Sequence, residues 1–385
     1  MDLQSKYDPG YRVIRLRGYS STMLDSTTVE LSGSLAGPTP RAATGVHAHP
    51  AWFGAVMGTG ALALALAAQS AHWAPRAFGA AAFTVLLLAS VYALVLAPRY
   101  LARLGSRRAL AAEMADPARG PMLATFPAGI LVLALAWGRA GGFGVPAAAA
   151  SGVALALLVL GVLVALGYGV AWTAILLRTT VAVEQVNGGW LIPPVMTLLV
   201  PLGVQPVMQR FPGPAADLGV VAFAFLGIGG LLFLALFGLL MMRLALHAPL
   251  PAALAPSLAI PLAPAPVLGL ATLRLLQGAA SHGVTTFGGI GAGLALSAVG
   301  LGFAAWWLAV VTIELGRLHR LGGLSTHPGW WGFVFPTGAL ALTLDALGSA
   351  IDSSVLVWLG AIVTGVLALV WAVVALWTVR DVVRH

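Results

Sequence analysis

Few side chains in this 385-residue sequence can carry out covalent chemistry. Cysteine is absent, which excludes disulfides, thiolate metal sites and thiol catalysis. The motifs of zinc proteases, serine hydrolases and nucleotide-binding P-loops are absent too. His47 and His49 form an H-x-H pair, but two imidazoles without a carboxylate or thiolate make a poor metal site. The sequence therefore predicts no catalytic residue, no metal and no cofactor.

The elements that must position the remaining polar groups are membrane helices. Hydrophobic residues make up 59% of the chain and charged residues 8%, and the apolar runs are long enough to cross a bilayer. Hydropathy, together with the Pro, Gly and charged residues that separate the apolar runs, predicts an all-α polytopic membrane protein with ten transmembrane helices. The predicted spans are 51–70, 77–98, 121–137, 146–173, 190–208, 218–242, 255–274, 286–311, 330–350 and 353–379.

The basic residues report the topology. With ten spans, 16 of the 20 lysines and arginines fall on one face, and the other face keeps only Arg76, Arg139, Arg210 and Arg274. The positive-inside rule then places both termini in the cytoplasm, in a multi-pass protein of the cell membrane. The net charge of +8 is explained in this way and predicts no nucleic-acid partner.

Three regions are expected along the chain. Residues 1–48 contain no apolar segment of the kind a signal peptide needs and predict a flexible cytoplasmic tail. Residues 49–380 form the ten-helix membrane domain, and residues 381–385 are a short cytoplasmic end.

Proline recurs in the odd-numbered spans. The third contains "TFPAG" and the ninth "VFPTG", while the fifth has "LIPPVMTLLVPLG" and the seventh "LAIPLAPAPVLG". Proline inside a helix removes a hydrogen bond and kinks it, which a bilayer tolerates only where protein or water reaches the freed carbonyl. This rhythm predicts five helical hairpins, with the kinked odd helices inside and the even helices facing lipid. Gly58 and Gly60 in the first span are expected either to admit a neighbouring backbone or to leave open space along an axis.

Three segments carry a resemblance to a known family. "PAWFGAVMGTG" in the first span, "WLIPPVMTLLVPLG" in the fifth and "WWGFVFPTGALAL" in the ninth resemble the tellurite-resistance/dicarboxylate transporter family. That family includes bacterial tellurite-resistance proteins, yeast malate permeases and sulfite exporters, and plant slow anion channels. The resemblance covers about residues 49–380 and implies five hairpins around a central pore lined by the odd helices, commonly in a homotrimer.

The resemblance also implies a gate. In the family, a phenylalanine in the middle of the membrane closes the pore, and the residue that matches it here is Phe335. Phe333 is the nearest alternative for this role, and Phe126 occupies the corresponding position in the third span. The predicted pore lining consists of glycines, prolines and hydroxyl residues of the odd spans. These are Gly58, Thr59, Gly60, Thr125, Pro127, Pro194, Thr197, Pro201, Ser257, Pro261, Pro264, Pro336 and Thr337.

The odd spans have no ionisable residue in their middle portions, since Arg274 and Asp345 lie near span ends. This favours weak stabilisation of anions by backbone N–H groups and hydroxyls over a tight carboxylate clamp or proton relay. The four non-cytoplasmic arginines are expected mainly to reach lipid headgroups.

The sequence thus predicts an anion channel or facilitative transporter for a small inorganic or organic anion. It does not choose among tellurite, sulfite, C4-dicarboxylates, chloride and nitrate. A proton-coupled malate or sulfite carrier is the alternative, which Glu184 or Asp217 in the pore would favour. A membrane-embedded enzyme using Asp345 and Asp352 is the remote one.

Overall fold

The computed structural model describes residues 49–281, 288–322 and 328–384, and every regular element in these ranges is a helix. Ten segments there are long and apolar enough to cross a membrane. They are Pro50–Gln69, Pro75–Gly105, Pro121–Ala140, Ala147–Leu176, Gly188–Arg210, Ala215–Leu246, Ala252–Ser281, Gly291–Arg320, Pro328–Ala350 and Ser354–Arg380. Each overlaps one predicted span in the same order, so the predicted ten-span, all-α membrane fold is confirmed. The predicted tail, residues 1–48, lies outside the described residues.

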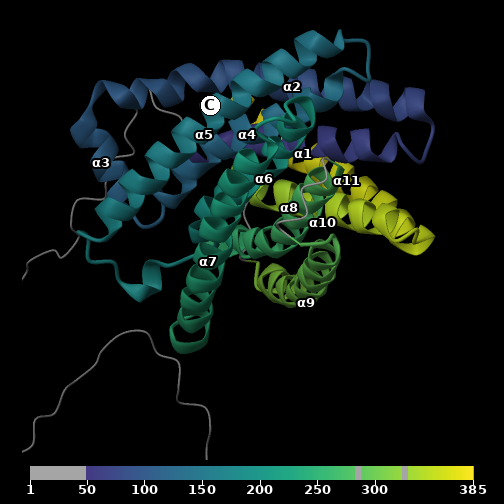
Figure 1. Cartoon of the computed structure of the whole chain (residues 1–385). Helices are drawn as coiled ribbons and strands as arrows, with labels where there is room; N and C mark the ends of the chain where they lie inside the picture. The colour runs from purple at the N-terminus through teal and green to yellow at the C-terminus, as the bar shows by residue number, and fades with distance from the viewer. Residues whose placement is uncertain (1–48, 282–287, 323–327, 385) are drawn as a thin grey trace, which may run out of the picture. The chain divides into compact units, whose positions relative to one another are not determined.

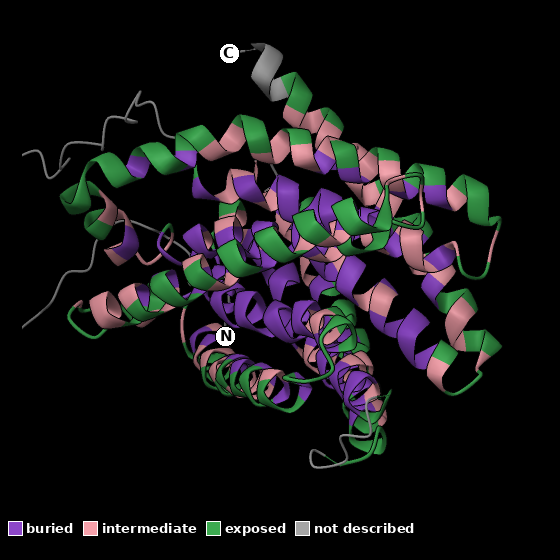
Figure 2. Ribbon diagram, turned by 45° about the horizontal axis from the view of Figure 1, so that its top comes forward, coloured by how far each residue is buried: buried purple, intermediate pink, exposed green. Residues whose placement is uncertain are grey.

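The ten segments fall into two classes by burial (Figure 2). In the odd-numbered segments, 67 to 83% of the most apolar window is buried, against 17 to 28% in the even-numbered ones. We call the helices of the first class the inner helices: α1 (Gly54–Gln69), α4 (Thr125–Ala140), α6 (Ile192–Arg210), α8 (Pro264–Ser281) and α10 (Trp331–Ala350). The outer helices are α2 (Pro75–Leu101), α5 (Ala147–Leu176), α7 (Ala215–Leu246), α9 (Gly291–Arg320) and α11 (Ser354–Arg384). The predicted division into inside and outside helices is therefore correct.

Contacts between helices define five hairpins. Each inner helix packs against the outer helix that follows it, as α1 does with α2 and α10 with α11. The inner helices also pack in the cyclic order α1, α4, α6, α8, α10 and back to α1. Figure 1 shows this arrangement, with the labelled outer helices around the inner ones. The inner helices thus form a closed ring, and all five cross it in the same direction.

A 3₁₀ segment precedes every inner helix. These segments are η1 (Pro50–Phe53), η3 (Pro121–Ala124), η5 (Gly188–Leu191), η6 (Ala252–Leu262) and η7 (Pro328–Trp330). Three of them begin with proline, which suits a first helical position because its φ is fixed and the N–H it lacks would have no partner there.

The prolines play a different part from the one expected. Pro127 and Pro194 lie in the first turn of α4 and α6, and Pro264 is the first residue of α8. Proline in a first turn breaks no intrahelical hydrogen bond. Pro201 and Pro336 do lie inside α6 and α10. Much of the proline rhythm therefore marks helix starts, and only part of it marks positions that can kink a helix.

The glycines of α1 sit at close helix contacts. A Cβ atom added to Gly58 would lie 2.9 Å from Val334 Cβ of α10, and one added to Gly60 would lie 2.6 Å from Val132 Cγ1 of α4. Real Cβ contacts are longer than this, so only glycine allows both neighbours to approach. Of the two expectations for this pair, close approach is correct and open space is wrong.

The connection from α2 to α4 is helical rather than a plain basic loop. It contains η2 (Ala102–Gly105) and α3 (Arg107–Ala115). Ser106 caps α3, because its hydroxyl accepts a hydrogen bond from the Ala109 N–H at 3.2 Å. A further short turn, η4 (Val183–Gln185), joins α5 to η5.

Candidate functional site

A cavity of about 440 Å³ lies at the N-terminal ends of the inner helices. All five inner segments contribute to its wall, for example through Gly54, Thr125, Ile192, Ser257 and Phe335. Helices that start at one place direct the positive ends of their dipoles towards it. The cavity is therefore a place where five chain segments converge, four of them at the N-terminal ends of α1, α4, α6 and α10 and the fifth through η6.

Phe335 lies in the wall of this cavity, beside Pro336. Its side chain is 7% exposed and belongs to the same buried apolar cluster as Met57 and Ile260, which also line the cavity. Phe333 instead packs against Trp330, with ring centroids 5.3 Å apart, and is not among the lining residues. Of the two phenylalanines that the sequence left in competition, the structure therefore places Phe335 at the cavity.

Phe126 occupies a different environment. Its ring meets Phe53 edge-on at 4.8 Å and stacks on Tyr100 of α2 at 5.3 Å. It is absent from the cavity wall. This packing fits a structural contact between α4 and the first hairpin, and does not fit the predicted second gate.

Three predicted pore residues besides Phe335 line the cavity, namely Thr125, Ser257 and Pro336. The Ser257 hydroxyl accepts a hydrogen bond from the Gly188 N–H at 3.2 Å, which leaves its own hydrogen to donate. The Thr125 hydroxyl lies 2.8 Å from the Met122 carbonyl and 3.0 Å from the Pro50 carbonyl, so its hydrogen is engaged. Ser257 is thus the better donor for a ligand in the cavity.

Several predicted pore residues face other helices instead. The Thr59 hydroxyl accepts a hydrogen bond from Trp371 Nε1 of α11 at 2.9 Å. The Thr197 hydroxyl donates to the Pro194 carbonyl at 2.8 Å and lies against Gly229 of α7. Both threonines therefore point from the inner ring towards outer helices, and neither lines the cavity.

The remaining predicted residues are helix-packing positions or remain without an assigned role. Thr337 donates to the Phe333 carbonyl at 2.8 Å within α10. The other members are buried in the inner segments and are not part of the cavity wall. They are Gly58, Gly60, Pro127, Pro194, Pro201, Pro261 and Pro264.

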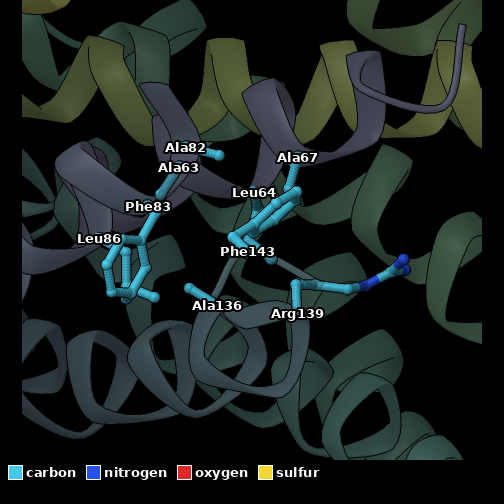
Figure 3. A pocket seen from close by; sticks show the side chains of 9 residues that line it. All are labelled: Ala63, Leu64, Ala67, Ala82, Phe83, Leu86, Ala136, Arg139 and Phe143. Atoms are coloured by element: carbon cyan, nitrogen blue, oxygen red, sulfur yellow. The ribbon is translucent and has the colours of Figure 1, made fainter. Parts of the chain in front are cut away.

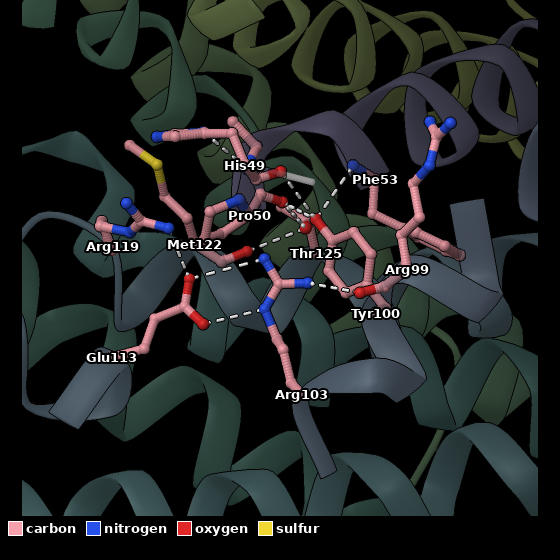
Figure 4. Close-up of polar contacts among 11 residues, drawn as sticks. His49, Pro50, Phe53, Arg99, Tyr100, Arg103, Glu113, Arg119, Met122 and Thr125 are labelled. Atoms are coloured by element: carbon pink, nitrogen blue, oxygen red, sulfur yellow. Dashed lines mark hydrogen bonds and ion pairs between the residues drawn. The ribbon is translucent and has the colours of Figure 1, made fainter. Parts of the chain in front are cut away.

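The charged wall of the cavity comes from Arg119 (Figure 4). Its Nη2 atom lies 2.8 Å from Glu113 Oε1, and Arg103 Nε donates to the other carboxylate oxygen of Glu113 at 2.8 Å. The Arg119 side chain is 44% exposed, whereas that of Arg103 is 4% exposed. Since a guanidinium has five N–H donors, Arg119 keeps donors for a ligand while Glu113 holds it in place.

Two titratable neighbours of Arg119, Glu113 and His49, both have lowered pKa values. Burial raises the pKa of Glu113, but hydrogen bonds from Arg103 and Arg119 outweigh it and hold this pKa below its ordinary value. Partial burial lowers the pKa of His49, and the charge of Arg119 lowers it further. His49 is therefore neutral at pH 7, and its Nδ1 accepts the Ala51 N–H at 3.2 Å. Glu113 thus lies between two arginines, and Asp116, whose charge also acts on His49, accepts hydrogen bonds from the Ala118 and Arg119 N–H groups at 2.8 Å.

A network of hydrogen bonds connects this wall of the cavity to the first hairpin (Figure 4). The Tyr100 hydroxyl of α2 is hydrogen-bonded to the Pro50 carbonyl and accepts from the Phe53 N–H at 3.2 Å. The Thr125 hydroxyl of α4 reaches the same Pro50 carbonyl. Three segments distant in the sequence are therefore joined at the start of η1.

A second hollow, between α1, α2 and α4, is too small for a substrate (Figure 3). It has a volume of about 10 Å³, enough for one water molecule at most. Its wall is apolar apart from Arg139, whose side chain extends away from the hollow. The larger cavity is the better candidate site.

Sequence reasoning missed Arg119 and Glu113 as parts of a site. Arg119 served only as one of the arginines that report topology. Glu113 lies on α3, six residues before Arg119, and the charge pattern of this short helix was the available signal. Its pairing with Arg103 depends on how α3 folds back on the end of α2, which no local pattern specifies.

The comparison with known proteins covers nearly the whole described chain. A family model described as "Voltage-dependent anion channel" (SLAC1) matches residues 47–379. No curated protein gives a significant match. The matched range spans all ten candidate membrane helices but for one residue at the end of the last.

Proposed function

Because the chain belongs to the voltage-dependent anion channel family, we propose that it conducts small anions along the axis of the ring of inner helices, with Phe335 as the gate. The family relationship supports anion transport across a membrane. The single observation that carries the finer proposal is the cavity of about 440 Å³, which all five inner segments build and in whose wall Phe335 lies.

The chemistry of the cavity fits a weakly bound anion. Among the described residues that line it, Arg119 and His49 are the charged or titratable ones, and none is a carboxylate. One partly exposed arginine, the Ser257 hydroxyl and the N-termini of four inner helices attract an anion without holding it tightly. Conduction needs this balance, because an ion must leave as readily as it enters.

The positions of two carboxylates favour a channel over the proton-coupled carrier. Glu184 lies in η4, pairs with His247 at 2.8 Å and is 57% exposed. Asp217 is exposed in the first turn of the outer helix α7. Neither lines the cavity, so the two carboxylates that would have favoured the proton-coupled carrier are not at the candidate site. Asp345 of α10 remains a buried carboxylate.

We further propose that the cavity opens to the cytoplasm, that both termini are cytoplasmic and that the protein resides in the cell membrane, as the distribution of basic residues favours. A homotrimer and a cytoplasmic tail of residues 1–48 are part of the same proposal, the trimer through the family resemblance. The physiological anion is to be found among chloride, nitrate, sulfite, tellurite and C4-dicarboxylates such as malate.

The test compares wild type with Phe335→Ala in liposomes. Efflux of chloride, nitrate, sulfite and malate is measured with and without a pH gradient. Removal of a ring that blocks the passage is expected to speed the flux of small anions by about tenfold or more, which corresponds to about 1.4 kcal/mol of barrier. Phe333→Ala is the matched control, since this ring lies off the cavity, and its flux should stay near that of wild type.

Two results would contradict the proposal. If wild type moves malate only when a pH gradient is present, and Phe335→Ala abolishes this movement, the coupled carrier is correct. If Phe333→Ala accelerates flux as much as Phe335→Ala does, the gate is not the residue at the cavity.

A further inference from the structure

His49 lines the same cavity as Arg119, and the proposed passage gives it no role so far (Figure 4). The two residues reach the cavity from different parts of the chain, His49 from the start of η1 and Arg119 from the connection before η3. Both side chains border one space, so an anion that enters the cavity approaches an imidazole as well as a guanidinium group.

Backbone contacts hold the segments of His49 and Arg119 against each other. The Thr125 hydroxyl lies 3.0 Å from the carbonyl of Pro50, the residue after His49, and 2.8 Å from the Met122 carbonyl. The Met122 N–H in turn donates a hydrogen bond to the Arg119 carbonyl at 3.1 Å. This chain of contacts ties the two backbones together, so the position of both residues at the cavity does not depend on their side chains alone.

The hydrogen bond at Nδ1 decides which nitrogen of His49 can donate to a ligand. Nδ1 accepts the Ala51 N–H at 3.2 Å and thereby caps η1. A neutral imidazole has one acceptor nitrogen and one donor nitrogen, so its hydrogen is on Nε2. Within the part of the chain that the structure describes, Nε2 forms no hydrogen bond. The Nε2–H group therefore remains available to an anion.

The charged groups around His49 keep its ring neutral while the cavity is empty. Burial, and then the charges of Arg119 and Arg103, hold the pKa of His49 below its ordinary value of 6.5, against the opposing charges of Glu113 and Asp116. Both carboxylates are engaged, because Glu113 pairs with the two arginines and Asp116 accepts backbone N–H groups at 2.8 Å. An anion in the cavity shifts this balance, since a nearby negative charge favours the protonated ring.

We propose that His49 is a second contact for a small anion in this cavity, next to Arg119, and that a proton and the anion bind there together. A protonated His49 adds a positive charge to the wall, so the anion binds more tightly as the pH falls. Protonation also breaks the cap on η1, because a protonated Nδ1 cannot accept the Ala51 N–H. The inference rests on the proposed function and deepens it, since it assigns regulation by pH to the same cavity.

The first experiment measures binding without flux. Nitrate is titrated into the purified protein at constant ionic strength, and the rise in melting temperature gives its apparent affinity at about pH 7 and about pH 5. Wild type is expected to bind nitrate about fivefold more tightly at the lower pH, the small end of ordinary coupling between two ligands. Wild type should also take up protons when nitrate is added to a weakly buffered sample. This pH range lies above the lowered pKa of Glu113, so the Arg119 pair stays intact.

The variant His49→Asn separates anion binding from capping. Asparagine is a favoured N-cap residue with an acceptor for the Ala51 N–H, but it has no titrating group. Stability without nitrate should stay near that of wild type, whereas the proton uptake and the pH dependence of nitrate binding should be lost. His319→Asn, at the exposed end of α9 and outside the cavity wall, is the matched control and should keep both.

Two results would overturn the inference. If wild type takes up no protons with nitrate, or if His49→Asn keeps the pH dependence of wild type, His49 is not an anion contact. The proton uptake of wild type needs no variant and decides the matter even if a variant does not fold. Nitrate flux into liposomes separates this failure from that of the proposed function. If nitrate does not cross in wild type but still binds together with a proton at His49, the proposed function fails and the contact stands.

Discussion

The inner helices have a lower mean hydropathy than the outer helices, 1.3 to 1.7 against 2.0 to 2.6, although they are by far the more buried. In a water-soluble protein the more buried helices would be the more apolar. In a bilayer the surrounding lipid is itself apolar, so the strongest hydropathy marks contact with lipid. The inner segments can therefore contain residues that contact with lipid would disfavour. These are prolines, closely packed glycines and the charged residues Arg274 and Asp345.

Glycine also differs between the inner ring and the exposed face of the outer helices, although outer-helix glycines that face the ring, such as Gly161 and Gly229, are closely packed too. Gly60 of α1 meets Val132, whereas Gly167 of α5 has no atom within 4 Å of the place where a Cβ would stand. The same residue type is thus a close-packing device in the inner ring and a neutral position on the outer face. Four predictions sharpen the comparison between the inner and outer regions.

The largest effect is expected from Gly60→Val. The new side chain would force α1 and α4 apart, at a cost of about 3 kcal/mol in the free energy of unfolding, the upper part of the range for overpacking. The matched variant Gly167→Val adds the same atoms to an open surface and should change stability by less than about 0.5 kcal/mol. Unfolding of the purified proteins in detergent measures both. Equal losses in the two variants would contradict the difference between inner and outer glycines.

A smaller effect is expected from Glu113→Gln, which breaks the link between the end of α2 and the cavity wall. Loss of the carboxylate leaves the Arg103 side chain, 4% exposed, without its charged partner, at a cost of about 2 kcal/mol. The matched variant is Glu314→Gln on α9, whose pair with Arg317 is more exposed and should contribute much less to stability. Comparable losses would show that burial of the ion pair does not matter.

The same pair predicts a pH dependence. The pKa of Glu113 is lower in the folded protein than its ordinary value of 4.5. Its stabilisation is therefore complete above pH 4.5 and is lost as the pH falls through the folded pKa. The melting temperature of wild type should fall more steeply than that of Glu113→Gln on acidification below this value. Parallel melting curves for the two proteins would contradict the lowered pKa.

The architecture could be predicted from the sequence because it depends on average properties of long segments. Hydropathy and the sixteen-to-four distribution of basic residues locate ten spans, and proline distinguishes inner from outer ones. The family motif also pointed to Phe335, which lines the cavity. The environment of Phe126 could not be predicted, because the rings of Phe53 and Tyr100 that contact it come from other segments. Direction within a helix depends on neighbours that a local pattern does not contain.

Thr59 is the clearest case, and it provides the smallest predicted effect. Met57 lines the cavity, and two further residues along an α-helix turn a side chain by about 200°, away from the cavity. Thr59 accordingly meets Trp371 of α11. Thr59→Val should cost about 1 kcal/mol, because it leaves the Trp371 N–H without an acceptor, and should leave the selectivity among anions unchanged.

The matched variant for Thr59 is Thr312→Val on α9, whose hydroxyl bonds only to the Leu308 carbonyl of its own helix, at 2.7 Å. It should be neutral in stability, because valine leaves no donor unpaired there. Chemical unfolding and the relative flux of chloride and nitrate measure the two properties separately. A change of selectivity in Thr59→Val without a loss of stability would indicate that Thr59 lines the pore. A loss of stability alone would show that this hydroxyl joins the inner ring to the outer one.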